Sequence, residues 1–512
     1  MLSHLCRTEA LVVEFSSDAS KYLVACDTHV KVFSSKDDSL VREIECMGIR
    51  AASFSPLGGY IVTFQRPMKN EEGQFQPNLR LWSVQDGACL IEFNQKELDR
   101  DHWPNIQFTS DEKHCVHRVT NTLHVYDLSS DCTSGPCVKF PVKGVSKFSL
   151  SPTARMENPE SMLVITYVPE IKGTPGYLAL HQMKQCQQGG APVPIARKSF
   201  FRANSVRFLW NSIGTAVLII AAADVDATNQ SYYGEQKLFF FSADGTKDMA
   251  VPMPKEGPIH DVQWSPKGDF FIAVSGFMPA KSTLFNSMCV PKFDLGSGPY
   301  SLIRWNPFGR FFVLAGFGNL PGDMTFYDKK ADCKCKVMGS TRASNGVSLD
   351  WSPCGRYVLT ATTAPRLRVD NGFQIFKYNG NLLNKKEYPV LYEARWKPAE
   401  NGVFEDRPQT PRAQGAKEAP LPSIPQPTRS KGYVPPHLRS QGITSAPKAS
   451  FSLARDQADV GGKIKPGSIS ASRTGSSNLP PGAEEVAPTS KAASKNARRR
   501  AKKKQGTADG TS

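Results

Sequence analysis

Short runs of β-branched and aromatic residues recur through the first 400 residues and are separated by polar turns. Residues 22–25 and 30–33 form one pair of such runs. Residues 79–84 alternate apolar with polar side chains before Asp86-Gly87, a dipeptide typical of hairpin turns. A period of two predicts strands, and we find no amphipathic helical pattern longer than about two turns in this part of the chain. The body of the protein is therefore predicted to be all-β.

A turn phrase closes many of these runs: an aromatic residue, then Ser or Asn, Pro, one further residue and Gly. The clearest copies begin at Phe54, Trp264, Trp305 and Trp351. Looser copies begin at Phe15, Phe108, Phe148, Trp210 and Trp396. Pro presets the backbone angle of a tight turn and Gly supplies the positive one. Nine copies, 39 to 62 residues apart, predict a nine-bladed, WD-repeat-like β-propeller with one four-stranded blade per copy; seven or eight blades remain open if looser copies are turns within blades.

Polar insertions at residues 67–77, 153–161 and 182–194 account for the wider spacings and are expected as loops between strands. The longest apolar run, residues 216–223, is far too short to span a membrane and is expected as a buried strand. No membrane association is predicted.

Charge and aromatic content divide the chain near residue 403. Residues 401–512 carry 19 Lys and Arg against 8 Asp and Glu, a net charge of +11, whereas the first 400 residues carry 44 against 39. The same segment has three aromatic residues and cannot bury enough apolar surface to offset the entropy of ordering it. We predict a propeller over residues 1–403, a disordered Pro-, Ser- and Gly-rich linker over 404–490, and a basic tail over 491–512.

Motifs of catalysis and of metal binding are missing from the sequence. It contains no P-loop, no G-x-S-x-G, no H-E-x-x-H and no pair of cysteines at C-x-x-C spacing. No enzymatic activity, cofactor or metal is therefore expected. The start of the chain lacks the pattern of a signal peptide, and twelve cysteines without a disulfide-like framework suit the reducing cytosol. A cytoplasmic protein is predicted.

A basic cluster near the end of the chain has no acidic residue within it. It predicts phosphate binding that weakens steeply as salt rises, and without an aromatic side chain it should not distinguish bases. A nuclear-localisation signal or a merely solvated charge run are the alternatives. The predicted RNA-binding residues are Lys491, Lys495, Arg498, Arg499, Arg500, Lys502, Lys503 and Lys504.

Proline clusters upstream of the basic tail, from Pro420 to Pro427, and a short motif follows. Polyproline II geometry with one aromatic side chain is how linear motifs present themselves to partner domains, although a semi-rigid spacer would have the same composition. The candidate partner-binding residues are Tyr433, Pro435, Pro436 and Arg439.

Four basic residues of the body are candidate contacts for RNA phosphates on one face of the ring. The favoured alternative is that they pair with acidic residues such as Asp370 in the blade interfaces. They are Lys281, Arg310, Arg366 and Arg368.

Several stretches of the second half, taken in order, closely resemble the eukaryotic translation initiation factor 2A family. They are residues 231–236 (SYYGEQ), 257–262 (GPIHDV), 276–281 (GFMPAK), 314–320 (LAGFGNL) and 363–372 (TAPRLRVDNG), followed by 433–439 (YVPPHLR) in a basic tail. The resemblance implies a nine-bladed propeller with a C-terminal extension that carries the RNA and partner contacts.

The resemblance also implies a function. A factor of this family directs initiator methionyl-tRNA to the small ribosomal subunit without GTP and with the start codon in place, for a subset of mRNAs. The expected partners are the small ribosomal subunit, the tRNA, mRNA and other initiation factors, and the protein is expected to be a monomer. Longer members extend beyond both ends of this chain, so we expect its ring to close with other strands or to stay open at a strand edge. The alternatives are the related initiation factor 3 component that is also built on a large propeller, and a WD-repeat scaffold that docks proteins on the ribosome.

Overall fold

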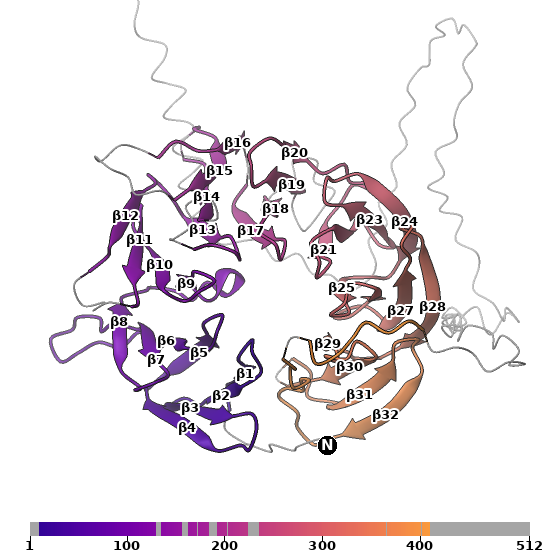
Figure 1. Cartoon of the computed structure of the whole chain (residues 1–512), viewed down its shortest axis with the longest axis horizontal. Helices are drawn as coiled ribbons and strands as arrows, with labels where there is room; N and C mark the ends of the chain where they lie inside the picture. The colour runs from indigo at the N-terminus through magenta and orange to yellow at the C-terminus, as the bar shows by residue number, and fades with distance from the viewer. Residues whose placement is uncertain are drawn as a thin grey trace, which may run out of the picture. The chain divides into compact units, whose positions relative to one another are not determined.

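The computed structural model of the chain describes residues 10–129, 135–155, 162–171, 173–183, 192–201, 203–223, 235–364, 366–400 and 402–409. Apart from one short 3-10 turn, η1 (Arg100–His102), its regular elements are strands, as predicted. The strands form eight four-stranded antiparallel sheets, each built from four consecutive strands. The sheets follow one another around a centre, with the first strand of each sheet innermost (Figure 1).

The first four sheets are β1 (Val12–Phe15), β2 (Lys21–Ala25), β3 (His29–Ser34) and β4 (Leu40–Glu45); β5 (Ile49–Phe54), β6 (Tyr60–Gln65), β7 (Leu79–Ser83) and β8 (Cys89–Phe93); β9 (Gln107–Phe108), β10 (His114–Val119), β11 (Thr122–Asp127) and β12 (Val138–Pro141); and β13 (Lys147–Leu150), β14 (Leu163–Val168), β15 (Gly176–Gln182) and β16 (Ala196–Phe200).

The last four are β17 (Ser205–Trp210), β18 (Ala216–Ala222), β19 (Gln236–Ser242) and β20 (Asp248–Ala250); β21 (Ile259–Trp264), β22 (Phe270–Ser275), β23 (Ala280–Asn286) and β24 (Pro291–Gly298); β25 (Leu302–Trp305), β26 (Phe311–Ala315), β27 (Asp323–Lys329) and β28 (Cys335–Arg342); and β29 (Ser348–Trp351), β30 (Tyr357–Thr362), β31 (Gly372–Lys377) and β32 (Leu382–Glu387).

The apolar runs of the sequence became strands where they were expected. β18 is buried along almost its whole length, as the unbroken apolar run predicted. The insertion at residues 67–77 is the loop between β6 and β7, and the insertions at 153–161 and 182–194 fall between β13 and β14 and between β15 and β16. The described residues of these connections form no further sheet.

Eight of the nine turn phrases lie where the first strand of a sheet turns into the second. In the copy that follows Trp264, the amide of Gly268 donates to the carbonyl of Ser265 over 2.9 Å, and Gly268 has a φ of +70°. That angle is strained for any residue with a Cβ, so the Gly is part of the turn. The Ser side chain also accepts a hydrogen bond from the amide of Phe270 at 3.3 Å. Pro, Gly and Ser thus build the turn locally.

The tryptophans of the phrase also join neighbouring sheets. The indole N–H of Trp264 donates to the carbonyl of Leu209 at 2.8 Å, that of Trp305 to Gln263 at 3.3 Å, and that of Trp351 to Arg304 at 3.0 Å. Each acceptor is the residue just before the aromatic residue of the preceding phrase. We call this series the tryptophan ladder.

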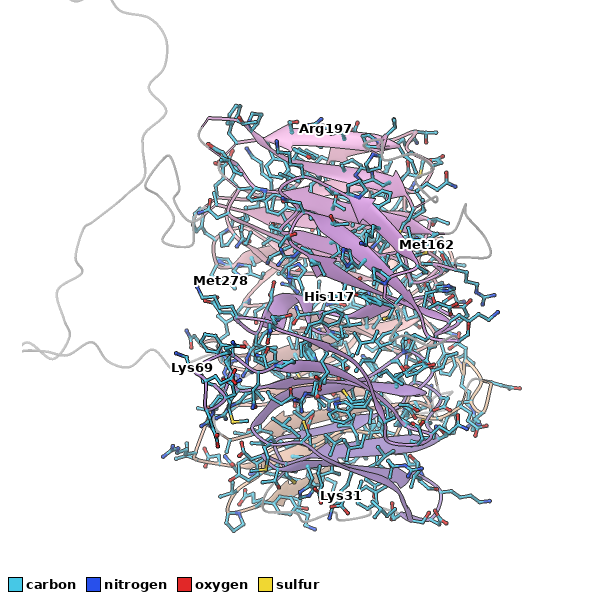
Figure 2. The ribbon with its side chains drawn as sticks, turned by 90° about the vertical axis from the view of Figure 1, so that its left-hand side faces the viewer. Lys31, Lys69, His117, Met162, Arg197 and Met278 are labelled. Atoms are coloured by element: carbon cyan, nitrogen blue, oxygen red, sulfur yellow. The ribbon has the colours of Figure 1, made fainter. Side chains whose placement is uncertain are left out.

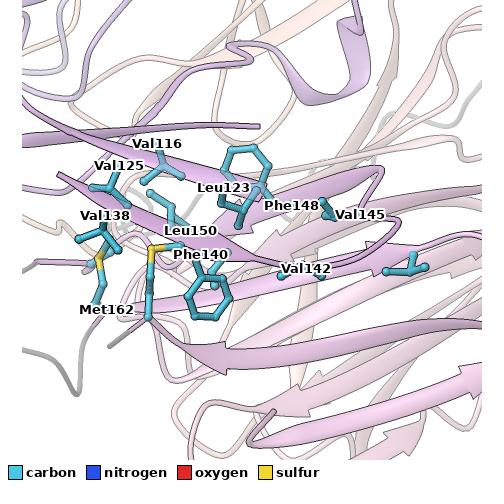
Figure 3. Close-up of a cluster of buried hydrophobic side chains, with 14 residues drawn as sticks. Val116, Leu123, Val125, Val138, Phe140, Val142, Val145, Phe148, Leu150 and Met162 are labelled. Carbon is cyan, nitrogen blue, oxygen red and sulfur yellow. The ribbon is translucent and has the colours of Figure 1, made fainter. Parts of the chain in front are cut away.

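Apolar side chains fill the spaces between neighbouring sheets. Seven buried clusters each contain residues of two consecutive sheets. Figure 3 shows the one between β9–β12 and β13–β16, where Leu123 and Phe140 meet Phe148 and Leu150. Each interior is therefore an interface between blades, as repeat architectures require.

The interface between the last sheet and the first is different. Here two separate clusters occur: one holds Tyr22, Val24 and Phe33 of the first sheet, and the other holds residues of the last sheet packed against Trp396 and its neighbours. We call this position the seam. The indole N–H of Trp396 donates to the carbonyl of Asp350 at 3.3 Å and so continues the tryptophan ladder, while Lys397 donates to the carbonyl of Ser35 in the first sheet.

The described residues thus form eight sheets and not the nine expected. The ninth copy of the phrase occupies the next place of the ladder, but residues 388–400 contain no strand. The count of nine is not confirmed, because the phrase specifies only an aromatic contact and a turn, whereas a blade also needs three further strands.

Candidate functional site

The two faces of the ring carry different connections. One face carries the turn phrases and the links between third and fourth strands, and we call it the turn face. The opposite, or loop, face carries the links between second and third strands and between sheets. Figure 2 shows the ring edge-on, with Lys69 and Met278 on one face and Met162, which follows a turn phrase, towards the other. A ligand that lies flat on the ring would meet one of these faces.

The four basic residues proposed from the sequence do not share a face. Lys281, in β23, and Arg366 and Arg368, between β30 and β31, lie toward the loop face, whereas Arg310 belongs to a phrase on the turn face. The expectation that they line one face is therefore wrong. Their separation follows from strand direction. Arg310 lies just before β26, the second strand of its sheet, whereas Lys281, Arg366 and Arg368 lie beyond the ends of the second strands β22 and β30.

Two of the four are held in ion pairs, but with other partners than the favoured alternative named and within one sheet instead of between blades. The Lys281 ammonium contacts the carboxylate of Asp294. The Arg310 guanidinium lies 3.2 Å from the carboxylate of Asp328, whose side chain is fully buried. Burial pushes the pKa of Asp328 upward, but hydrogen bonds from Lys330, Gln409 and Arg310 outweigh it and hold the pKa below its usual range. Both basic residues therefore serve the structure.

Arg366 and Arg368 are exposed and form no ion pair with any described residue. They lie in the segment that connects β30 to β31. A guanidinium that faces solvent without a carboxylate partner remains available to a phosphate. Of the four candidates, these two are the ones without an ion-pair partner among the described residues.

A raised loop on the same face was missed by sequence reasoning. Residues 276–279 join β22 to β23, and the Lys255 ammonium donates to the carbonyls of Phe277 at 2.6 Å and Pro279 at 2.8 Å. The lysine holds the loop so that Phe277 and Met278 remain 43% and 40% exposed. The sequence showed the loop as part of a family stretch, but it could not show that distant Lys255 clamps it.

A cavity of about 750 Å³ opens beside the seam, and we call it the aromatic groove. Five aromatic residues line it, together with three prolines: Phe308, Trp351, Tyr392, Trp396 and Phe404. Tyr392 and Phe404 are 56% and 40% exposed. Its charged residues are Asp350, Glu393, Arg395 and Glu400, of which Arg395 pairs with Glu393. The groove therefore combines aromatic and proline side chains with polar ones, and its charged residues give it a net negative charge.

The last described segment leaves the groove and runs onto the turn face. The Gln409 amide donates to Asp328 at 2.7 Å, and the Arg356 guanidinium donates to the carbonyl of Pro408 at 2.9 Å. Residues 404–409 therefore contact the sheets beyond the predicted boundary at 403. The predicted RNA-binding cluster of residues 491–504 and the partner motif of residues 433–439 lie outside the described residues.

The part of the chain that the structure describes contains no group of three metal-ligating side chains. Its nine cysteines are free, and burial raises the pKa of the Cys335 thiol to about 12, which suppresses the nucleophilic thiolate. No helix among the described residues is long and apolar enough to cross a membrane.

A ring of antiparallel four-stranded sheets, each with an aromatic turn phrase between its first two strands, places the chain in the class of β-propeller proteins. A solved structure described as "Crystal structure of the eukaryotic initiation factor" superposes with a TM-score of 0.68 at 29% identity and covers 77% of this chain and 92% of its own. This similarity confirms the propeller.

The family model described as "Eukaryotic translation initiation factor eIF2A" matches residues 198–394. Eukaryotic translation initiation factor 2A of Schizosaccharomyces pombe is 31% identical over 87% of this chain and 75% of its own length. A component of eukaryotic translation initiation factor 3 from Dictyostelium discoideum is more distant, at 24% identity over 75% of this chain and 56% of its own length. The chain belongs to the eukaryotic translation initiation factor 2A family.

Proposed function

We propose that this protein is a translation initiation factor that directs initiator methionyl-tRNA to the small ribosomal subunit, without GTP and dependent on the start codon, for a subset of mRNAs. Family membership carries the proposal, and it is supported by the basic cluster at 491–504 joined to a propeller. The protein acts in the cytoplasm as a non-catalytic monomer, with mRNA and other initiation factors as further partners.

The basic cluster contributes affinity for phosphates, while the propeller contributes placement. Eight cationic side chains release counterions when they meet RNA, so this contact should be strong and sensitive to salt. Arg366 and Arg368 add two exposed charges on the loop face, on the same face as the loop that presents Phe277. A face with a few unpaired cations suits contact with folded RNA, where shape and phosphates dominate recognition.

The test is co-sedimentation of the tagged protein with purified small ribosomal subunits, initiator methionyl-tRNA and an mRNA with or without AUG. We expect tRNA retention without GTP and only with the AUG message. A variant with Ala at residues 498–500 and 502–504 should lose retention. A matched control replaces six basic residues of the linker and so removes the same charge elsewhere: Arg429, Lys448, Arg455, Lys463, Lys465 and Arg473. The control should keep most of the activity.

The alternative is a WD-repeat scaffold that docks proteins on the ribosome, favoured by the exposed apolar loop at Phe277 and Met278. It predicts sedimentation with the ribosome that is indifferent to tRNA and to the basic cluster. Replacing Arg366 and Arg368 with Ala distinguishes the two further. If they contact phosphates, the slope of log affinity against log salt should fall by about 2, whereas the ion-paired Lys281→Ala should change it little.

A further inference from the structure

We propose that the aromatic groove binds the proline-rich segment 420–427 of the same chain in an extended, polyproline II conformation. The groove lies beside the seam, between the inner strand β29 of the last sheet and the segment that carries Trp396. This contact is independent of the proposed role in tRNA delivery.

The chemistry of the groove suits proline. Aromatic rings and prolines make up eight of its seventeen lining residues, and domains that recognise proline-rich peptides dock them in aromatic-lined grooves. The Tyr392 ring is 56% exposed at its rim, and its hydroxyl forms no hydrogen bond with another described residue. A polyproline II chain presents free carbonyls that such a hydroxyl can reach, because it has no internal hydrogen bonds. A volume of about 750 Å³ is within the usual range for a ligand site.

Charge favours this segment over RNA. Asp350 and Glu400 form no ion pair among the described residues, so the groove presents two uncompensated carboxylates. RNA phosphates would be repelled by them. Residues 412–431 carry Arg412, Lys417, Arg429 and Lys431 against the single acid Glu418. The proline-rich segment therefore brings cations to both of its ends, and their attraction to the carboxylates would steer the segment into the groove.

The chain can reach the groove. Phe404 lines it, and Gln409, five residues later, is held at Asp328; these two points are thus at most about 18 Å apart. The eleven residues from Gln409 to Pro420 span about 36 Å when extended. A loop of this length can turn back at a small entropic cost, and the tether keeps the segment at a high effective concentration near the groove.

Binding of the segment would also fix the point on the propeller from which the rest of the tail extends. With residues 420–427 docked, the partner motif at Tyr433 would start at the rim of the groove. A partner that competes for the groove would release the proline-rich segment and, with it, the partner motif.

The test places the photoreactive residue p-benzoylphenylalanine at Gln426 in the full-length chain and maps its crosslinks by mass spectrometry. We expect crosslinks to groove residues of the same molecule, shown by mixing isotopically heavy and light protein. The double variant Tyr392→Ala, Phe404→Ala should lower the yield about tenfold, as loss of aromatic anchors does. Both side chains are exposed, so the thermal midpoint should not change.

Matched controls isolate the groove. Phe75→Ala and Val369→Ala remove exposed apolar side chains on the loop face and should leave the yield unchanged. Should the groove variant unfold, replacing Pro422, Pro425 and Pro427 with Ala provides an independent test, and it should also reduce capture about tenfold.

Three outcomes would overturn the proposal. Crosslinks that map outside the groove would place the segment elsewhere. A yield unaffected by both sets of substitutions would show that capture is non-specific. Mixed heavy–light crosslinks at the proportion expected for random pairing of molecules would identify a second copy of the chain as the donor of the segment.

Discussion

Replacing Trp351 with alanine should destabilise the propeller by about 3–5 kcal/mol. The side chain is 9% exposed and belongs to the buried cluster between the last two sheets. Its ring meets Phe326 edge-on, with centroids 6.4 Å apart, and its N–H donates to the carbonyl of Arg304 at 3.0 Å. The substitution would therefore remove a large apolar contact and one rung of the tryptophan ladder together.

The two contributions can be separated with Trp351→Phe. Phenylalanine keeps an aromatic ring in the cluster but has no N–H, so the carbonyl of Arg304 loses its donor. A buried acceptor without a partner costs about 1–3 kcal/mol. We therefore expect this variant to lie between wild type and Trp351→Ala.

The assay is equilibrium unfolding in urea, followed by circular dichroism and by tryptophan fluorescence, with agreement of the two signals required before free energies are compared. Phe201→Ala, which truncates a side chain that is 62% exposed, is the control and should stay within about 0.5 kcal/mol of wild type. If Trp351→Phe matched this control, the ladder would contribute nothing to stability. A cost of less than about 1 kcal/mol for Trp351→Ala would refute the role of the phrase as a core element.

Three further predictions concern buried ionisable groups and the tail. Asp328→Asn should lower the unfolding free energy at pH 7 by about 1–3 kcal/mol, because it removes the charge that pairs with Arg310; an unchanged urea midpoint would show that the pair is dispensable. Burial lowers the pKa of His181 to about 4, so the unfolded chain takes up the proton first, and stability should fall as pH drops from about 6.5 to 4, by up to about 3 kcal/mol. His181→Leu should make that profile shallower, with a remaining slope from His117, whose pKa burial also lowers to about 4; an equally steep profile would assign the loss to groups other than His181. Alanine at residues 498–500 and 502–504 should leave the thermal midpoint of the propeller unchanged, whereas a drop of several degrees would mean that the tail packs on the ring.

Local chemistry explains why so much of the fold could be predicted. Strand runs such as the one at 216–223 have a hydrophobic pattern that few other structures accommodate. The turn around Gly268 depends on Pro and on a positive φ, which are properties of single residues. Both signals are complete within a few positions of the chain.

The candidate site was harder to predict from the sequence, because it depends on contacts between residues that are distant in the chain. Arg310 and Arg366 look alike in the sequence, yet only the first meets a buried carboxylate, Asp328, once β27 has paired beside β26. Lys255 lies in the connection between β20 and β21, and its ammonium donates to the carbonyl of Phe277 in the loop between β22 and β23. Hydrophobic patterning gives each strand a face, but it does not state which charged side chains will meet.

By itself, the sequence determined the all-β character of the body, the turn at each phrase and the resemblance to the family. The tertiary structure decided the number of complete sheets, the face on which each basic residue lies and the existence of the aromatic groove. The ninth phrase illustrates the difference. Its Trp396 makes the same contact as the other ladder tryptophans, because one residue suffices for a rung, but a sheet forms only when further strands are there to satisfy one another's backbone hydrogen bonds.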